Sequence, residues 1–257
     1  IIMASFFIYD SINMYRSDND VNEGTVSGSS PTQTFAESDV ITNHERAADQ
    51  NIGTTFTAIN VGDTIQYALG SSATADVAAA YFTGASGGSG SIIRILSGAS
   101  GSITNLETIA VATEAGWKVG DLTSTTSDKF YVKFLNAVSN VSEVIIGKKL
   151  TFEVEPEINV QTSKDYGTQV QKSLGGVEYA INTHNGQEIF TISFQNISST
   201  FKSDLLTFED ANKAQGKKFL YYDGTNYNWV RLDRPMVFTE VADGRFSTQI
   251  VMRQQIQ

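Results

Sequence analysis

Hydrophobic and polar residues alternate along much of the chain, and this period-2 pattern is typical of half-buried antiparallel strands. In the first half the pattern is clearest in residues 63–69 (DTIQYAL) and 129–134 (KFYVKF). In the second of these segments Phe130, Val132 and Phe134 fall on one face. Between them, residues 81–105 are rich in Gly and Ser around a short apolar run. Strands divided this often by turn residues favour a β-sandwich over βαβ units.

The pattern changes near residue 150. Residues 150–155 (LTFEVE) place Leu150, Phe152 and Val154 opposite three polar side chains. Between the two halves, Gly147-Lys148-Lys149 predicts a tight turn joining the last strand of one domain to the first strand of the next. A connection this short would hold the two domains in a fixed relation.

The second half predicts an antiparallel α+β unit of the order β-β-α-β-β-β. Asn185-Gly186 predicts a type I′ hairpin turn, and Asp223-Gly224 and Asp243-Gly244 predict two more hairpins. A helix is expected near residues 200–215, ending at Gly216. The helix is supported by candidate caps at Ser198, Ser199 and Thr200, by Phe201, Leu205 and Phe208 on one face, and by Lys213, Lys217 and Lys218 near its end. The final strand carries Phe246, Ile250, Met252 and Ile256 on one side.

We therefore predict a mainly β protein with two domains. Residues 1–149 would form a jelly-roll β-sandwich with an irregular, polar lead-in over 10–55, and residues 150–257 a β-rich, tail-tube-like sandwich with one helix. The chain has 257 residues, which is long enough for either one large or two medium domains.

Composition narrows the function classes. There is no Cys, so disulfides, thiolate zinc sites and Cys nucleophiles are excluded. A net charge of −10 argues against a nucleic-acid-binding surface. No apolar run approaches the roughly 20 residues of a membrane span. The start, IIMASFFIYD, lacks a basic n-region and is a poor signal peptide, with Met3 the expected natural start. The sequons at Asn140 and Asn196 are then chance matches.

Two short motifs suggest catalysis but lack the rest of their sites. Gly147-Lys148-Lys149 is not preceded by the glycine of a phosphate-binding loop, and a strand follows it instead of a helix. Residues 84–88 (GASGG) match G-x-S-x-G, which would make Ser86 a nucleophile. No helix follows, and the two histidines, His44 and His184, lie in polar segments. We predict no enzyme activity, no catalytic residues and no cofactor.

Two groups of carboxylates are candidates for metal ligands or catalytic acids. Asp18, Asp20, Asn22 and Gly24 resemble a calcium loop but lack the EF-hand Gly and Glu, so a solvated loop is favoured over a structural calcium site and no metal site is predicted. A strand would place Glu153, Glu155 and Glu157 together on its solvent face, where charge protects an exposed strand.

Aromatic residues offer either core packing or ligand contact. The set comprises Trp117, Tyr221, Tyr222, Tyr227 and Trp229. Core packing is the favoured interpretation, with Tyr222 paired to Tyr227 or Trp229 across a hairpin. Stacking on sugars or at an interface is the other.

Two segments resemble discoidin-like (galactose-binding-like) jelly rolls. DTIQYALGSSATADVAAAYF is similar to their strand–loop–strand, and SDKFYVKFLNAVSNVSEVIIGKKL to their closing strands. Together with FFIYDSINMYRSD near the start, most of the second half (from SKDYGTQVQKSLGG to RPMVFTE) resembles tailed-bacteriophage tail and baseplate structural proteins. In better-known distal tail proteins the ring domain comes first, so the domain order here departs from that pattern.

The resemblance implies a virion component at the distal tail, assembled in the host cytoplasm. It would form a ring with copies of itself and connect tail tube to hub or fibres, with no nucleic acid and no membrane insertion. The second hypothesis is a carbohydrate-binding module that recognises host surface glycans, and a hydrolase is the third.

Overall fold

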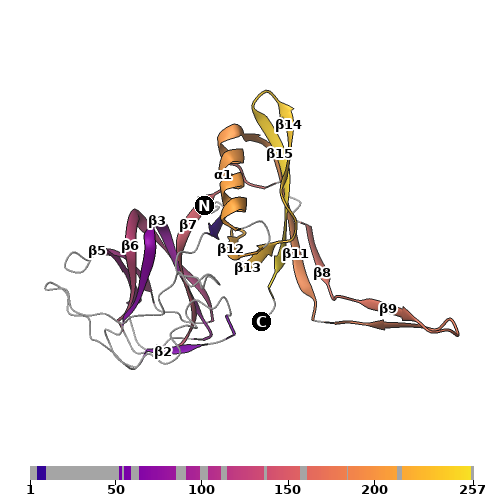
Figure 1. Ribbon diagram of the computed structural model, residues 1–257, viewed down its shortest axis with the longest axis horizontal. Helices are drawn as coiled ribbons and strands as arrows, with labels where there is room; N and C mark the ends of the chain where they lie inside the picture. The colour runs from indigo at the N-terminus through magenta and orange to yellow at the C-terminus, as the bar shows by residue number, and fades with distance from the viewer. Residues whose placement is uncertain are drawn as a thin grey trace. The chain divides into compact units, whose positions relative to one another are not determined.

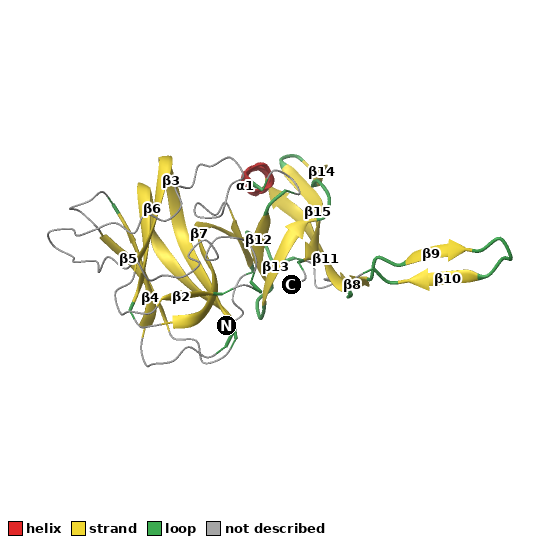
Figure 2. Ribbon diagram, turned by 60° about the horizontal axis from the view of Figure 1, so that its bottom comes forward, coloured by secondary structure: helices red, strands yellow, loops and turns green. Residues whose placement is uncertain are grey.

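The protein was analysed as a computed structural model, which describes the following residues: 5–9, 52–53, 55–58, 64–84, 91–98, 104–110, 115–135, 138–156, 161–183, 185–212 and 216–255. The chain divides into two compact units. One consists of Ser11–Lys149 and is called the first unit; the other combines Ile1–Asp10 with Leu150–Ile256 and is called the second unit. Figure 1 and Figure 2 show that the described residues are mostly strands, in antiparallel sheets, with one helix. The predicted mainly β sandwich architecture is confirmed.

The first unit is a β-sandwich built around two long strands. Its strands are β2 (Phe56–Ala58), β3 (Thr64–Phe82), β4 (Ser91–Ser97), β5 (Thr104–Ala110), β6 (Gly116–Phe134) and β7 (Val138–Thr151). They follow the order β5-β4-β6-β3-β7, with β2 also paired to β7. The core holds Phe130, Val132 and Phe134, as the alternation predicts, with Ile93 and Ile95 from the apolar run.

Two details of the first unit differ from the sequence prediction. The expected strand–loop–strand is one continuous strand, β3, whose pairing with β6 shifts register between Ala68 and Ala73. Gly147-Lys148-Lys149 is not a turn, because β7 runs straight through it and Gly147 pairs with Val77. Sheet pairing along both strands outweighs the local preference of Gly for turns, as non-local hydrogen bonds often do.

The second unit begins with the N-terminal strand, β1 (Phe6–Tyr9). The remaining elements, in chain order, are β8 (Gln161–Asp165), β9 (Gln169–Lys172), β10 (Glu178–Ile181), β11 (Gln187–Ser198), α1 (Ser199–Ala211), β12 (Lys218–Tyr222), β13 (Tyr227–Leu232), β14 (Val237–Ala242) and β15 (Arg245–Gln254). The sheet order is β1-β12-β13-β15-β11-β8, with β14 paired to β15.

The predicted division into 1–149 and 150–257 assigns the N-terminal strand to the first domain, whereas the structure groups this strand with the second unit. It pairs with β12 in the register Phe7 to Tyr221. Phe7 is fully buried and its ring centroid lies 4.6 Å from that of Phe208 and 5.2 Å from that of Phe219. An apolar strand of four residues is stabilised by burial in such a core, which the aromatic side chains of the second unit supply.

Helix α1 packs one face on the sheet of the second unit. Ser198 is the N-cap, and its hydroxyl accepts a hydrogen bond of 3.1 Å from the Phe201 amide. Phe201, Leu205 and Phe208 are buried, as predicted. The helix ends at Ala211 with Asn212 as C-cap, earlier than the predicted Gly216. The buried Asn212 side chain donates to the Phe208 carbonyl at 2.8 Å and so ends the helix before the lysines expected in its last turn.

Hairpins at Asp223-Gly224 and Asp243-Gly244 are confirmed, and both glycines have positive φ. In β15 the predicted alternation holds for Phe246, Ile250 and Met252, which pack in or against the core, while Ile256 lies outside the described residues.

The hairpin predicted at Asn185-Gly186 is wrong. Residues 178–181 pair with β9, and β11 pairs instead with β8 and β15. After residue 160, four strands precede α1 where the sequence predicts two, and four follow α1 where it predicts three. The turn of the actual hairpin contains Gly176, which has φ of 81°. Gly175-Gly176 supplies the permissive backbone that the Asn-Gly signal had seemed to offer.

We expect Phe7→Ala to destabilise the second unit by about 3–5 kcal/mol, because it removes a fully buried ring from a cluster of stacked aromatics. Leu206→Ala, at an exposed position on α1, is the control and should change stability by less than about 0.5 kcal/mol. Urea unfolding followed by tryptophan fluorescence measures both, and equal midpoints for the two variants would contradict a structural role of β1.

Candidate functional site

A two-stranded sheet extends from the second unit and forms its most exposed feature. Strands β9 and β10 pair only with each other in the described part of the chain. Every residue of both strands is exposed. We call residues 166–183 the arm. Figure 1 and Figure 2 both show it leading away from the ends of β8 and β11.

The two faces of the arm differ in chemistry. Cross-strand partners in an antiparallel pair share a face, so the register Tyr179 to Gln171 and Ile181 to Gln169 places these four side chains together. Val177 lies on the same face by the period of two, and its carbonyl accepts a hydrogen bond from the Ser173 amide at 2.8 Å. This face carries no charged residue.

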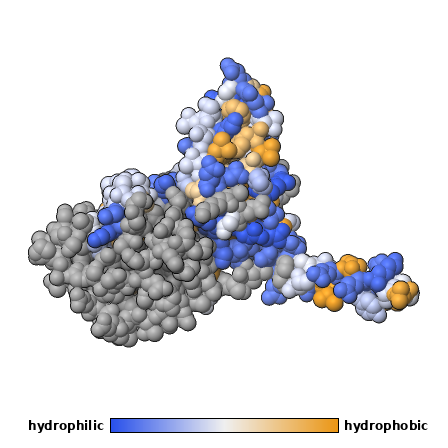
Figure 3. All heavy atoms as spheres, in the orientation of Figure 1, coloured by the Kyte–Doolittle hydropathy of each residue, from blue (hydrophilic) through white to orange (hydrophobic). Residues whose placement is uncertain are grey.

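We call Val177, Tyr179 and Ile181 the apolar row. Their exposed fractions are 54%, 57% and 57%, which is unusual for residues of this type in three successive same-face positions. Figure 3 shows hydrophobic colour along this part of the molecule. The opposite face holds the ion pair of Lys172 and Glu178, 3.4 Å apart, next to the exposed Val170 and its cross-strand partner Ala180.

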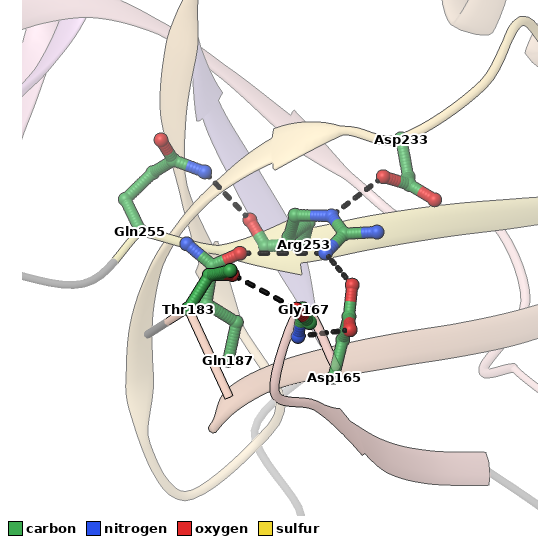
Figure 4. A network of polar contacts seen from close by, with 7 residues as sticks. All are labelled: Asp165, Gly167, Thr183, Gln187, Asp233, Arg253 and Gln255. Carbon is green, nitrogen blue, oxygen red and sulfur yellow. Dashed lines mark hydrogen bonds and ion pairs between the residues drawn. The ribbon is translucent and has the colours of Figure 1, made fainter. Parts of the chain in front are cut away.

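The base of the arm is held by a polar network around Arg253, shown in Figure 4. Its guanidinium contacts two carboxylates, that of Asp233 at 2.8 Å and that of Asp165 at 2.5 Å, and donates to the Gln187 side chain at 3.3 Å. Hydrogen bonds from Arg253 to Asp233 and to Asp165 raise the pKa of the guanidinium, and burial opposes them. Because Asp165 ends β8 and Gln187 begins β11, one side chain joins both strands that lead to the arm.

Further hydrogen bonds continue from this network into the arm. The second oxygen of Asp165 accepts from the Gly167 amide at 2.8 Å, and the Thr183 hydroxyl donates to the Gly167 carbonyl at 2.9 Å. Thr168 and Asn182 are joined by a bond of 2.8 Å between their side chains. The direction of the arm at its base is therefore fixed by polar contacts, although every residue of its two strands is exposed.

A groove lies on the face of the second sheet that points away from its core, which we call the outer face. Its volume is about 480 Å³. It is lined by Ser193, Phe194, Gln195, Arg234, Pro235, Val237, Thr239, Ser247, Thr248 and Gln249. None of these lining residues is acidic, and most carry a hydroxyl or an amide. Val237 is 73% exposed, and Val241, four residues further along β14, is 54% exposed.

A smaller polar cluster lies in the first unit, around Lys149 of the Gly147-Lys148-Lys149 segment. Asp76 accepts the backbone amide of Lys149 at 2.7 Å, and the Lys149 ammonium contacts Asp121 at 2.8 Å. Desolvation is the main cause that raises the pKa of Asp76, and the charge of Asp121 adds to it. Here Lys149 serves sheet structure, with its ammonium turned to a carboxylate and not to a phosphate site.

The predicted strand over residues 150–155 does not form, because β7 ends at Thr151, so Glu153 and Glu155 share no strand face. They contact separate parts of the second unit. Glu155 accepts hydrogen bonds from the amide and hydroxyl of Ser5 at 3.1 and 2.9 Å. Glu153 accepts from the hydroxyl of the N-cap Ser198 at 2.5 Å. They contact different partners and so form no acid–base pair. Glu157 lies outside the described residues.

The predicted aromatic contacts are mostly core. Trp117, Tyr221, Tyr222 and Trp229 are all buried, and the rings of Tyr222 and Tyr227 lie 4.6 Å apart across the predicted hairpin. Trp117 is 7% exposed and packs edge-on against Tyr81 with ring centroids 5.3 Å apart, so little of its ring is open to a sugar. The pKa of Tyr221 is raised, chiefly by burial.

Several sequence candidates lie outside the described residues: Ser86, His44, His184, Asp18, Asp20, Asn22 and Gly24. Within the described ranges no group of three or more His, Asp or Glu side chains is arranged to hold a metal ion. Over those same residues, no helix has the length and hydrophobicity needed to cross a membrane.

Comparisons with known proteins give likeness of fold only. No protein-family model matches the chain, and no curated protein matches it. Among solved structures, a family 32 carbohydrate-binding module of C. perfringens NanJ, in complex with galactose, aligns with 56% of this chain and 99% of its own at 13% identity and a TM-score of 0.36.

Two further structures are similar at the same level. The family 32 module of AlyQ, in complex with 4,5-unsaturated mannuronic acid, aligns with 45% of this chain and 92% of its own at 20% identity and a TM-score of 0.36. SpGH29 aligns with 55% of this chain and 28% of its own at 10% identity and a TM-score of 0.39. Two of these three are carbohydrate-binding modules. The tail resemblance stays a prediction.

We expect Arg253→Lys to loosen the base of the arm, because an ammonium cannot span two carboxylates as the planar guanidinium does. Amide hydrogen exchange at Gly167 and Thr183 should accelerate on the order of tenfold, equivalent to about 1.4 kcal/mol. Arg245→Lys, at the other end of β15, is the matched control and should leave these amides unchanged. Unchanged amide exchange in Arg253→Lys would contradict the role of the Arg253 network in holding the base of the arm.

Asp76→Asn should make the protein less sensitive to pH in the acidic range. A carboxyl whose pKa is raised by folding stabilises the native state below its unfolded pKa of 3.8, and this contribution is lost as the pH rises through the raised value. Asparagine keeps the acceptor for the Lys149 amide without a charge. The melting temperature of the variant relative to the natural protein should therefore be higher at pH 7 than at pH 3. A constant difference across that range would contradict this role of Asp76.

Proposed function

We propose that this protein is a non-enzymatic structural component that assembles with copies of itself through its second unit. The observation that carries the proposal is the arm, whose uncharged face presents the apolar row of Val177, Tyr179 and Ile181 to solvent. Single exposed apolar residues are ordinary, but a contiguous row on a projecting hairpin is typical of a protein–protein contact.

The construction of the arm supports the same proposal. An isolated two-stranded hairpin is marginally stable in water, and the base of this one is fixed by Arg253, Asp165 and Thr183. A hairpin whose direction is set but whose faces are uncovered loses less entropy on docking than a loose loop would. The arm is therefore suited to hold a partner in one defined place.

The more specific form of the proposal is a virion component of a tailed bacteriophage, forming a ring at the distal tail or baseplate that connects tail tube to hub or fibres. It rests on the resemblance of residues 6–18 and of the second half to such proteins. In addition, β1, which belongs to the assembling second unit, precedes the β-sandwich of the first unit in the sequence.

A second candidate function is glycan recognition by the first unit. It is supported by the β-sandwich of that unit and by the resemblance of residues 63–82 and 127–150 to galactose-binding-like jelly rolls. The two functions are compatible, since one unit would assemble and the other would face the ligand. A glycan array probed with the whole protein tests it, and a binding-negative result over galactose-containing and uronic-acid-containing glycans would argue against this candidate.

Self-association should depend on the apolar row. Light scattering coupled to size-exclusion chromatography should show an oligomer for the natural protein. The double substitution Tyr179→Ala with Ile181→Ala should raise the dissociation constant of the oligomer on the order of 100-fold, because each truncation of a buried interface side chain costs about 1–2 kcal/mol.

The matched control changes the opposite face of the same hairpin. Lys172→Ala with Glu178→Ala removes an exposed ion pair, which contributes less than about 1 kcal/mol. This variant should keep the mass of the natural oligomer. A natural protein that stays monomeric at every concentration tested, with or without tail-tube protein, would overturn the proposed function.

A further inference from the structure

The apolar row on the arm has a matching surface elsewhere on the same unit. Besides the arm and Leu206 on α1, the large hydrophobic side chains that are exposed among the described residues are Val237 and Val241, both on β14. Strand β14 pairs only with β15 in the described part of the chain, so its other backbone edge is unpaired. Unpaired strand edges are places where another strand can add.

The arm and β14 lie toward opposite edges of the sheet of the second unit. Strand β15 pairs through residues 245–249 with both β11 and β14. One strand edge cannot serve two partners at the same residues, so β11 and β14 lie on different edges of β15. The arm continues from β8, which pairs with the far edge of β11. The arm therefore leaves the sheet on the side away from β14.

The receiving surface is hollowed and complementary in chemistry. The groove on the outer face, about 480 Å³, runs along β14 and includes Val237 and Thr239. Its hydroxyl and amide groups can bond the Tyr179 hydroxyl and the two glutamines beside the row, and its volume accepts an aromatic side chain. No carboxylate lines the groove, and no charge lies on the face of the arm that carries the row. The charged side chain that lines the groove is Arg234, which donates a hydrogen bond to the Gln249 side chain and so keeps a polar partner when the row docks.

We propose that the apolar row of one copy docks into the groove beside β14 of the next copy. This inference rests on the proposed self-assembly and names its two surfaces. Because the surfaces are different and lie toward opposite edges of the sheet, the contact is heterologous, head to tail. Such a contact repeats from copy to copy and gives a closed ring when the rotation between copies closes, and an open filament otherwise.

The natural absence of Cys makes the contact testable by cross-linking. Tyr179 is the central residue of the row and Thr239 is the middle residue of the exposed β14 series, so the two approach each other whichever way the strands run. Separately prepared Tyr179→Cys and Thr239→Cys proteins are mixed and oxidised. A heterodimer should dominate the mixture by at least fivefold over the homodimers formed when each is oxidised alone.

Thr207→Cys, at an exposed position on α1, is the matched control partner for Tyr179→Cys and should give only background cross-linking. The doubly substituted Tyr179→Cys/Thr239→Cys protein should form a covalent ladder. Homodimers of Tyr179→Cys alone, at the yield of the mixture, would replace the proposal with arm-to-arm contact.

The outcomes separate this inference from the proposed function. An oligomer by light scattering without the Tyr179–Thr239 heterodimer would overturn the groove as the docking site and leave self-assembly standing. A strict monomer without the cross-link would overturn both. Oligomer mass that persists in the arm variant, with the cross-link absent, would place the contact on another surface and also reject the inference.

Discussion

The packing of β1 into the second unit is the constraint on which the rest of the architecture depends. Phe7 is fully buried among Phe208, Phe219 and Tyr221, and its strand pairs with β12. The chain therefore starts one unit, leaves it for about 140 residues and returns at Leu150. The first unit is an insertion into the second, and the unit with the arm has to complete its core from segments far apart in the sequence.

Local patterns predicted the elements whose partners are close in sequence. The helix at Phe201, Leu205 and Phe208 and the turns at Gly224 and Gly244 follow from short-range signals, and the sandwich class follows from alternation and turn spacing. The turn proposed at Gly147 was wrong for the opposite reason. Hydrogen bonds to β3, seventy residues earlier in the chain, hold it in a continuous strand, and no local pattern contains that information.

The arm was the least predictable part of the candidate site. From the sequence we expect the residues before Asn185-Gly186 to form one strand of a hairpin, and no local pattern says what covers the apolar face of that strand. The Asn185-Gly186 signal favoured a hairpin with β11, whereas Gly175-Gly176 makes the turn and β9 is the partner. The Arg253 network joins three distant segments, and sequence reasoning missed it because no spacing connects Asp165, Asp233 and Arg253.

The two open edges of the arm have a consequence for the life of the protein before it assembles. Among the described residues, β9 and β10 each have one backbone edge without a strand neighbour, and every side chain of the pair is exposed, so little packing resists local opening. Residues 166–183 are thus the stretch of the second unit where proteolytic cleavage should come first in the free chain. Burial of the same stretch in a neighbour would protect it, so that degradation removes unassembled copies and spares assembled ones.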